Sequence, residues 1–244
     1  MPKYFTSPES INGDEITLDE ETSLHLSRVL RCKAGDMITV GDGSDNDYEC
    51  EITEITKNAV RAKIIDKHLN LNEPDIKITL YQGLPKGDKT ELIIQKCVEI
   101  GVDRIVPVST TRSVVKLDKK GGKKIERWNK ISLSAAKQCG RGKIPEVSPV
   151  MTFKEAVEDS RKCDGRLIPY ENEQKNGLKS FCENFKGKSI AVFIGPEGGF
   201  DTSEIELAKA DGITPVTLGK RILRTETAGL VTAVILLHRL ENEE

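Results

Sequence analysis

Apolar and polar positions alternate through much of the first 70 residues of the chain. Apolar side chains occupy even positions from Tyr48 until Ile55 breaks the phase, and Val60–Ile64 alternates again. A period of two is typical of strands with one buried face. Glycine, serine, aspartate and asparagine fill residues 41–47 and separate Tyr48 from the apolar segment 38–40. This arrangement predicts a β-hairpin.

One helix is expected in this region, over Asp19–Leu30, with Leu24, Val29 and Leu30 facing inward. Short strands with a single helix predict a small β-barrel over residues 1–70.

The pattern changes after a linker at residues 69–74. From there, apolar segments of strand length alternate with stretches of helical periodicity. We predict strands at residues 76–82, 104–108, 166–170, 190–194 and 215–218. We predict helices at residues 89–100, 124–138, 153–159, 178–185, 203–210 and 226–240. Asp88 and Asp201 each precede a glutamate by three residues, the spacing of a capping box, and Gly101 suits a helix end. This alternation predicts an α/β domain with a mainly parallel sheet over residues 75–244.

Composition places the chain among soluble globular proteins. Of its 244 residues, 37% are hydrophobic and 31% charged, which is too apolar for a disordered chain. The six cysteines lack the spacing of a metal site, so we expect reduced thiols in a cytoplasmic protein and no structural metal. The first residues lack the apolar core of a signal peptide, and the longest apolar run, Gly229–Leu237, is about half a membrane span. We therefore expect neither secretion nor a membrane.

The charge is unevenly distributed. Residues 1–72 hold 8 basic and 14 acidic residues, a net −6, and the rest of the chain holds 29 basic and 25 acidic residues, a net +4. The segment from Arg112 to Lys143 contains eleven basic residues and only two acidic ones, Asp118 and Glu126. A net +9 in 32 residues is typical of a surface that binds a phosphate backbone, although a solvated helix face would look similar.

Three glycine-containing segments follow predicted strands: Gln82–Lys89, Ile194–Phe200 and Leu218–Ala228. Ligands of open α/β sheets bind outside the carboxyl ends of the strands, and glycines there let the backbone approach a ligand. An ordinary turn remains an alternative for Ile194–Phe200. Leu218–Ala228 is less easily explained as a solvated loop, because its charged residues flank apolar Ile222 and Leu223. The sequence contains no GxGxxG, GxxxxGK[ST], GxSxG or HExxH motif.

These segments, following a small β domain, resemble the bacterial 16S ribosomal RNA uracil-N3 methyltransferase family of the SPOUT superfamily. The resemblance covers essentially the whole chain, and its last two motifs together are highly specific. The motifs read HLSRVLR at 25–31, KTELIIQKCVEIG at 89–101, AAKQCGR at 135–141, IGPEGGF at 194–200 and LGKRILRTETA at 218–228.

The resemblance implies a PUA-like β-barrel for RNA, followed by a SPOUT α/β domain with a trefoil knot at its C-terminal end. It also implies a homodimer that uses S-adenosylmethionine to methylate N3 of a specific uridine in 16S rRNA, either free or in the small ribosomal subunit. The cofactor-binding residues that it implies are Leu167, Pro169, Glu171, Ile194, Gly195, Pro196, Glu197, Gly198, Gly199, Leu218, Gly219, Ile222, Leu223, Thr227 and Ala228.

Arg224 and Glu226 are the candidate catalytic residues. Uracil N3 is a poor nucleophile until its proton leaves, and a guanidinium can stabilise the negative charge that then develops. Glu226 would orient Arg224 or take the proton, although a glutamate at a helix start also favours the helix dipole. No metal is needed. The candidate RNA-binding residues are Arg28, Arg31, Arg112, Lys119, Lys120, Lys123, Lys124 and Arg141.

Two other classes of protein remain open at this point. A non-catalytic RNA-binding assembly factor could use the same scaffold, and it would not bind S-adenosylmethionine. A nucleotide- or phosphate-binding α/β enzyme could use residues 195–199 as an anion-binding turn. The missing phosphate-binding motifs argue against this second class.

Overall fold

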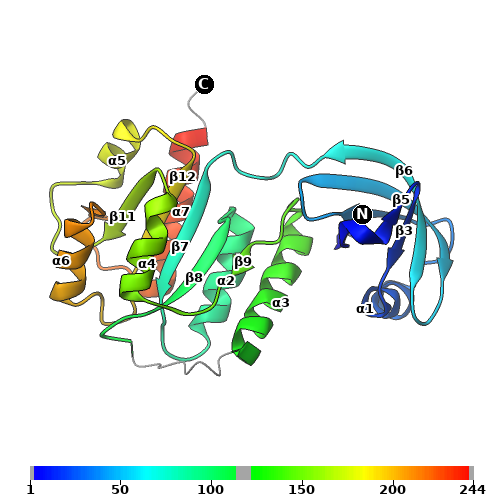
Figure 1. Cartoon of the computed structure of the whole chain (residues 1–244), viewed down its shortest axis with the longest axis horizontal. Coiled ribbons are helices and arrows are strands. Elements are labelled where there is room, and N and C mark those ends of the chain that lie inside the picture. Colours follow the sequence, from blue (N-terminus) through cyan, green and yellow to red (C-terminus); the bar gives the residue numbers. More distant parts are fainter. Residues whose placement is uncertain (1–2, 114–121, 242–244) are drawn as a thin grey trace. The chain divides into compact units, whose positions relative to one another are not determined.

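The computed structural model describes residues 3–113 and 122–241 and divides the chain into two units. The first unit consists of Met1–Glu73 together with Ala136–Ile144, and the second of Pro74–Ala135 and Pro145–Glu244 (Figure 1). The first unit therefore contains a second, short segment far along the chain. The predicted division at residues 70–75 did not include that segment.

The first unit is built on a mixed sheet in the order β1-β4-β5-β6-β3-β2. The strands β4 (Met37–Gly41) and β5 (Asn46–Ile55) form the predicted hairpin, and β6 (Val60–Leu69) pairs with β5. The short strands are β1 (Lys3–Phe5), β2 (Ile11–Asn12) and β3 (Glu15–Leu18), and a turn of helix, η1, spans Pro8–Ser10. Alternate residues of these strands, such as Ile38, Cys50 and Ile52, are fully or almost fully buried and form one core.

The expected helix at residues 19–30 is not one regular helix. It consists of α1 (Glu20–Leu24) and a π-helical segment, η2 (His25–Leu30). Its buried residues are Thr22, Ser23 and Leu26, while Val29 and Leu30 are exposed. The prediction that Val29 and Leu30 face inward was therefore wrong. A π-helix has hydrogen bonds from i to i+5, so a spacing of 3.6 residues does not follow its buried face.

Arg141, a predicted RNA contact, is buried in the first unit, where it forms an ion pair with Glu73. The Glu73 carboxylate accepts from Arg141 Nη2 at 2.6 Å and from the backbone N–H groups of Gly142 and Lys143. Burial alone would raise the pKa of Glu73, but these donors outweigh it and lower the pKa below its ordinary value. Arg141 thus joins two distant parts of the unit and is not exposed to a phosphate backbone. The prediction failed because sequence does not show which basic residues have a buried acidic partner.

The second unit contains a parallel sheet in the order β10-β8-β7-β12-β11-β13, with β9 also paired to β8. Five strands match predicted segments to within a few residues: β7 (Lys77–Gly83), β8 (Arg104–Ser109), β11 (Gly165–Pro169), β12 (Ser189–Ile194) and β13 (Thr214–Val216). The two-residue strands β9 (Glu146–Val147) and β10 (Met151–Thr152) were not predicted, because two residues show no periodicity. The fold class, α/β with a mainly parallel sheet, is confirmed.

The helices of this unit also agree with the predicted segments. They are α2 (Lys89–Ile100), α3 (Gly122–Cys139), α4 (Phe153–Asp159) with the short η3 (Ser160–Lys162), α5 (Leu178–Asn184), α6 (Thr202–Ala210) and α7 (Thr225–Glu241). Asp201 forms the predicted capping box at the start of α6, whereas the Asp88 side chain accepts no capping hydrogen bond at α2. Gly101 ends α2 in the left-handed conformation, as expected.

Helices cover both faces of the parallel sheet. Tyr81 stacks on Phe193 with ring centroids 4.6 Å apart, on the face where α4 and α6 pack. Neighbouring residues of a strand point to opposite faces, and accordingly Leu80 lies against α7 at Gly229. Figure 1 shows α7 along β12 and β7.

Candidate functional site

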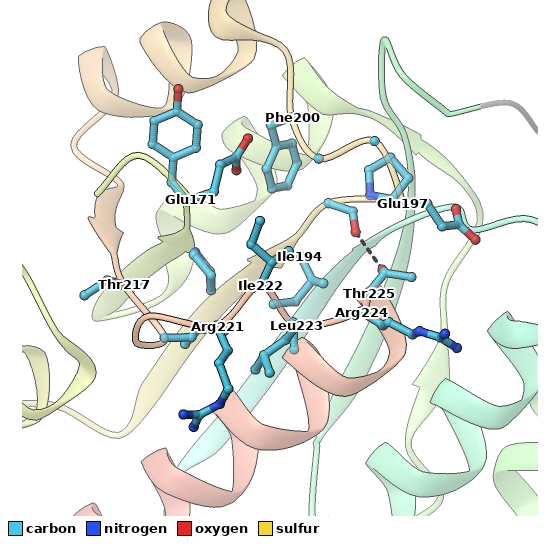
Figure 2. Close-up of a pocket in the computed structure, with 18 of the residues that line it drawn as sticks. Glu171, Ile194, Glu197, Phe200, Thr217, Arg221, Ile222, Leu223, Arg224 and Thr225 are labelled. Carbon is cyan, nitrogen blue, oxygen red and sulfur yellow. Dashed lines mark hydrogen bonds between the residues drawn. The ribbon is translucent and has the colours of Figure 1, made fainter. Parts of the chain in front are cut away.

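A pocket of about 540 Å³ lies at the carboxyl ends of β11, β12 and β13 (Figure 2). Three loops that follow parallel strands meet there, because the carboxyl ends of such strands lie at one edge of the sheet. The pocket is lined by Lys89, Pro169, Tyr170, Glu171, Ile194, Gly195, Pro196, Glu197, Gly198, Gly199, Phe200, Thr217, Leu218, Gly219, Lys220, Arg221, Ile222, Leu223, Arg224, Thr225 and Ala228.

The loop after β12 packs so closely that a side chain would be crowded at Gly195 and would clash at Gly83. A Cβ atom on Gly195 would lie 3.1 Å from the backbone of Gly199. One on Gly83, at the end of β7, would lie 2.6 Å from Pro196 Cδ and 2.7 Å from its nitrogen. Side chains at these positions would push the loop away from the sheet. The glycines of residues 195–199 therefore let this loop form a compact wall of the pocket. The segment is thus more than a turn that connects a strand to a helix.

Thr225, the first residue of α7, is hydrogen-bonded to β7 and to the loop after β12. Its hydroxyl donates to the carbonyl oxygen of Gly195 at 2.6 Å (Figure 2) and accepts from Gln82 Nε2 at 2.9 Å. Both Thr225 and Gln82 are buried. A buried polar group must be hydrogen-bonded to avoid a desolvation cost, so this chain of contacts holds β7, the loop after β12 and the start of α7 together.

Four charged groups lie beside the pocket. Lys89 Nζ lies 3.0 Å from Glu197 Oε1 and 3.5 Å from Glu226 Oε2, and Arg224 Nη1 lies 4.0 Å from Glu226 Oε1. The hydrogen bond to Glu197 raises the pKa of Lys89 above its ordinary value. Burial raises the pKa of Glu197, but the donors Lys89 Nζ and Lys86 N–H outweigh it, so that the pKa is lowered. Both groups are therefore held in their charged forms.

Most predicted cofactor-binding residues line the pocket, and only Leu167 and Thr227 do not. Leu167 is fully buried within β11, where its side chain belongs to the sheet interior. Of the two predicted catalytic residues, Arg224 lines the pocket, and its side chain is 84% exposed. Glu226 lies behind it with a side chain only 16% exposed.

The sequence did not single out several residues that the structure brings to this site. Thr225 and Gln82 were within the glycine-containing segments but received no role, and Lys89 was assigned to a weak motif. Tyr170, Phe200 and Thr217 also line the pocket. Lys89 could have been noticed in the sequence because it directly follows a loop at the end of a strand. Only the fold shows that two glutamates lie beside it.

The predicted RNA-binding residues belong to both units. Arg28 and Arg31 are exposed on the first unit, and Lys123 and Lys124 are exposed at the start of α3 in the second. Lys119 and Lys120 lie outside the described residues. Arg112 donates from Nη1 to the carbonyl oxygen of Gly198 at 2.9 Å and forms an ion pair with Asp201. Arg112 thus supports the pocket wall, and contact with phosphate stays a prediction.

Within residues 3–113 and 122–241, no group of three or more His, Cys, Asp or Glu side chains is arranged to hold a metal ion. The same described segments include no helix that is long and apolar enough to cross a membrane.

Comparison with known proteins gives two family matches. Residues 72–237 match the family described as "RNA methyltransferase domain", and residues 18–65 match "RNA methyltransferase PUA domain". Ribosomal RNA small subunit methyltransferase E of Bacillus subtilis (strain 168) is 37% identical, over 99% of this chain and 98% of its own. The same-named protein of Mesomycoplasma hyopneumoniae (strain 232) is 36% identical, over 94% of this chain and 96% of its own.

A solved structure is similarly close. The crystal structure of a ribosomal RNA small subunit methyltransferase E from Neisseria gonorrhoeae, bound to S-adenosyl methionine, superposes with a TM-score of 0.88. It is 34% identical, and the match covers 97% of this chain and 96% of that one. Both the sequence and the fold are therefore matched over nearly the full length. The chain belongs to the ribosomal RNA small subunit methyltransferase E family.

Proposed function

We propose that this protein transfers a methyl group from S-adenosylmethionine to N3 of a specific uridine in 16S rRNA. Family membership supports a methyltransferase that uses S-adenosylmethionine and acts on the small-subunit RNA. The observation that carries the proposal is the pocket at the ends of β11, β12 and β13, which the family motifs line. N3 of uridine as the acceptor atom comes from the sequence resemblance.

The residues of the pocket fit this cofactor. A volume of about 540 Å³ suits a molecule built of a nucleoside and an amino acid. Adenine presents donors and acceptors that backbone groups can pair with, and the glycines at 195, 198 and 199 keep side chains out of their way. Ile222, 90% exposed, and Leu223 supply an apolar cover for a ring.

S-adenosylmethionine, when bound, supplies a methyl group already activated on a sulfonium. The residues of the chain must then align the uridine, exclude water and stabilise the charge on the base. Arg224 is exposed at the pocket and can donate to a uracil oxygen as N3 loses its proton. Glu226 does not line the pocket, so accepting the proton suits it less well; it lies 4.0 Å from Arg224 and can affect where that guanidinium points.

The remaining parts of the proposal concern the fold and the partners. We infer a PUA-like barrel in the first unit and a C-terminal trefoil knot in the second, both from the family resemblance. We infer RNA contacts from Arg28, Arg31, Arg112, Lys123 and Lys124, and from Lys119 and Lys120 of the basic stretch. We further infer a homodimer in the cytoplasm, where ribosomal RNA is available, and catalysis without a metal.

The decisive experiment is mass mapping of 16S rRNA from cells that lack this protein. We expect one uridine to lose a methyl group and to regain it when the gene is restored. Calorimetric titration of the purified protein with S-adenosylmethionine in the presence of chelator should show about one site per chain. A full methylation pattern in the deleted strain would refute the activity. Failure to bind the donor would favour a non-catalytic assembly factor.

A further inference from the structure

Lys89 contacts two parts of the site that are far apart in sequence. It is the first residue of α2, and its Nζ lies between Glu197 of the loop after β12 and Glu226 of α7. The shorter contact, 3.0 Å, is to Glu197, and the contact to Glu226 is 3.5 Å. The Glu197 carboxylate also accepts from the backbone N–H of Lys86. The two glutamates therefore share one ammonium group.

Glu226 in turn faces two cations. Arg224 Nη1 lies 4.0 Å from its Oε1, further than Lys89 Nζ from its Oε2. The Arg224 side chain is 84% exposed, while that of Glu226 is 16% exposed. A mostly buried carboxylate without a counter-charge is costly, so it would draw in the nearest guanidinium if Lys89 were absent. Figure 2 shows Arg224 and Glu197 on the same side of the pocket.

We propose that Lys89 is a positioning residue whose ammonium group neutralises the charge of the Glu226 carboxylate. The Arg224 guanidinium can then turn away from Glu226 and contact the uracil of the substrate. In this arrangement Lys89 need not touch the RNA or the donor. It acts through Glu226 and, by its contact with Glu197, joins the loop after β12 to the start of α7. The inference depends on the proposed function, because the step that it supports is the transfer to uridine.

The test compares Lys89→Met with wild type in steady-state methylation of 16S rRNA. We expect kcat to fall about 10-fold, as is common when a supporting partner of a functional group is lost, with little change in the KM for RNA. Lys89→Arg keeps the charge and should restore part of the rate. Lys96→Met is the matched control, because Lys96 lies on the same helix and pairs with Glu99. It should behave as wild type.

A double-mutant cycle separates positioning from a general structural effect. If Lys89 acts through Glu226, Lys89→Met should add little to Glu226→Gln, since a neutral amide no longer competes for Arg224. Independent additive losses would overturn the proposal. A raised KM for RNA at unchanged kcat would do the same, because it would indicate a direct RNA contact.

A titration of the Lys89 side chain tests its contacts without measuring activity. The amine of Lys89, followed by NMR of its labelled side chain, should titrate at lower pH in Glu197→Gln and, by a smaller amount, in Glu226→Gln, since each loses an acidic neighbour. A titration unaffected by both changes would contradict the shared contact. If wild type itself methylates no uridine N3, the proposed function fails. If it does while Lys89→Met keeps the full rate, only the role of Lys89 fails.

Discussion

At the scale of single residues, two of the arginines predicted to act on RNA have opposite surroundings. Arg224 is largely exposed at the pocket, whereas Arg141 is buried against Glu73. An exposed guanidinium beside a pocket can turn to a substrate, and a buried one with a carboxylate partner cannot leave without a desolvation cost. The same side chain is thus expected to serve catalysis at one position and stability at the other.

Replacing Arg224 with alanine should reduce methylation far more than donor binding. A hydrogen-bond donor directed at developing charge contributes about 10²–10³ in rate. Arg224→Lys keeps the charge but loses the planar arrangement of donors, so it should restore activity only in part. Single-turnover methylation and donor titration on the same variants measure both quantities. A fall in donor affinity that matches the fall in rate would show a structural role.

Replacing Glu73 with glutamine should destabilise the first unit by about 3–5 kcal/mol, the cost of removing one partner of a buried ion pair. The pKa of Glu73 is lowered from 4.5 in the folded state. Its stabilising contribution is therefore complete above pH 4.5 and lost as the pH falls through the folded-state pKa. Urea unfolding should show a wild-type advantage at pH 7 that shrinks below about pH 4.5.

Glu54→Gln is the control for this prediction, because Glu54 and Arg61 form an exposed pair in the same unit. Exposed pairs contribute about 0–1 kcal/mol, so this variant should unfold almost like wild type. Equal losses in the two variants would mean that the buried contact of Glu73 has no special weight.

At the scale of elements, the pocket depends on how closely the strand ends approach one another. Gly83 of β7 and Pro196 of the following loop leave no room for a methyl group. The buried contacts of Thr225 join the same elements to α7. The shape of the pocket is thus a property of three loops together.

Replacing Gly83 with alanine should displace residues 195–199 and weaken donor binding by about 10-fold or more. The reason is that its Cβ would meet the ring Cδ of Pro196 at 2.6 Å and its backbone nitrogen at 2.7 Å, and neither atom can rotate away as a flexible side chain would. Calorimetric titration measures the effect. Gly122→Ala is the control, since a Cβ there meets nothing within 4 Å. Unchanged affinity in Gly83→Ala would mean that the loop does not form the cofactor site.

Lys123 and Lys124 lie at the start of α3, and Lys119 and Lys120 of the same basic stretch lie outside the described residues. Replacing Lys119, Lys120, Lys123 and Lys124 with alanine should weaken RNA binding and leave donor affinity unchanged. Each lost phosphate contact should flatten the log–log salt dependence by roughly 0.7–0.9 units, through reduced counterion release. Lys179→Ala, on α5, removes an exposed lysine elsewhere and serves as control. An unchanged slope in the fourfold variant would show that these lysines face solvent and do not contact the RNA.

At the scale of the whole molecule, α7 packs against the sheet, α2 and α5 within the chain. Leu236 and Leu237 are buried by these contacts, yet Val234 on the same helix is 48% exposed. Val234 is therefore a position at which the inferred homodimer can be tested.

We expect the protein to sediment as a dimer of its 27.0 kDa chain. Val234→Glu should shift it toward monomer, because a charge at an apolar contact is costly to bury. Ile65→Glu is the control: Ile65 is 55% exposed on the first unit, and this change should leave the mass unchanged. A wild-type protein that sediments as a monomer and still methylates RNA would contradict the dimer.

The sequence alone determined the longer strands and helices of the α/β unit, the change from β to α/β architecture, and two loops of the site, those after β12 and β13. These features follow from local periodicity and from glycines at strand ends, and both signals can be read within a short segment of the sequence. The irregular helix at residues 20–30 escaped this reasoning, since its turn does not have the usual period.

Only the tertiary structure decided which charged side chains meet. Arg141 with Glu73, Arg112 with Asp201, and Lys89 with Glu197 and Glu226 are contacts between residues at least 68 positions apart. Nothing local distinguishes a basic residue with a buried partner from one facing solvent, because both types of position carry the same side chain. Burial and distance, which arise when the chain folds back on itself, assign their different roles.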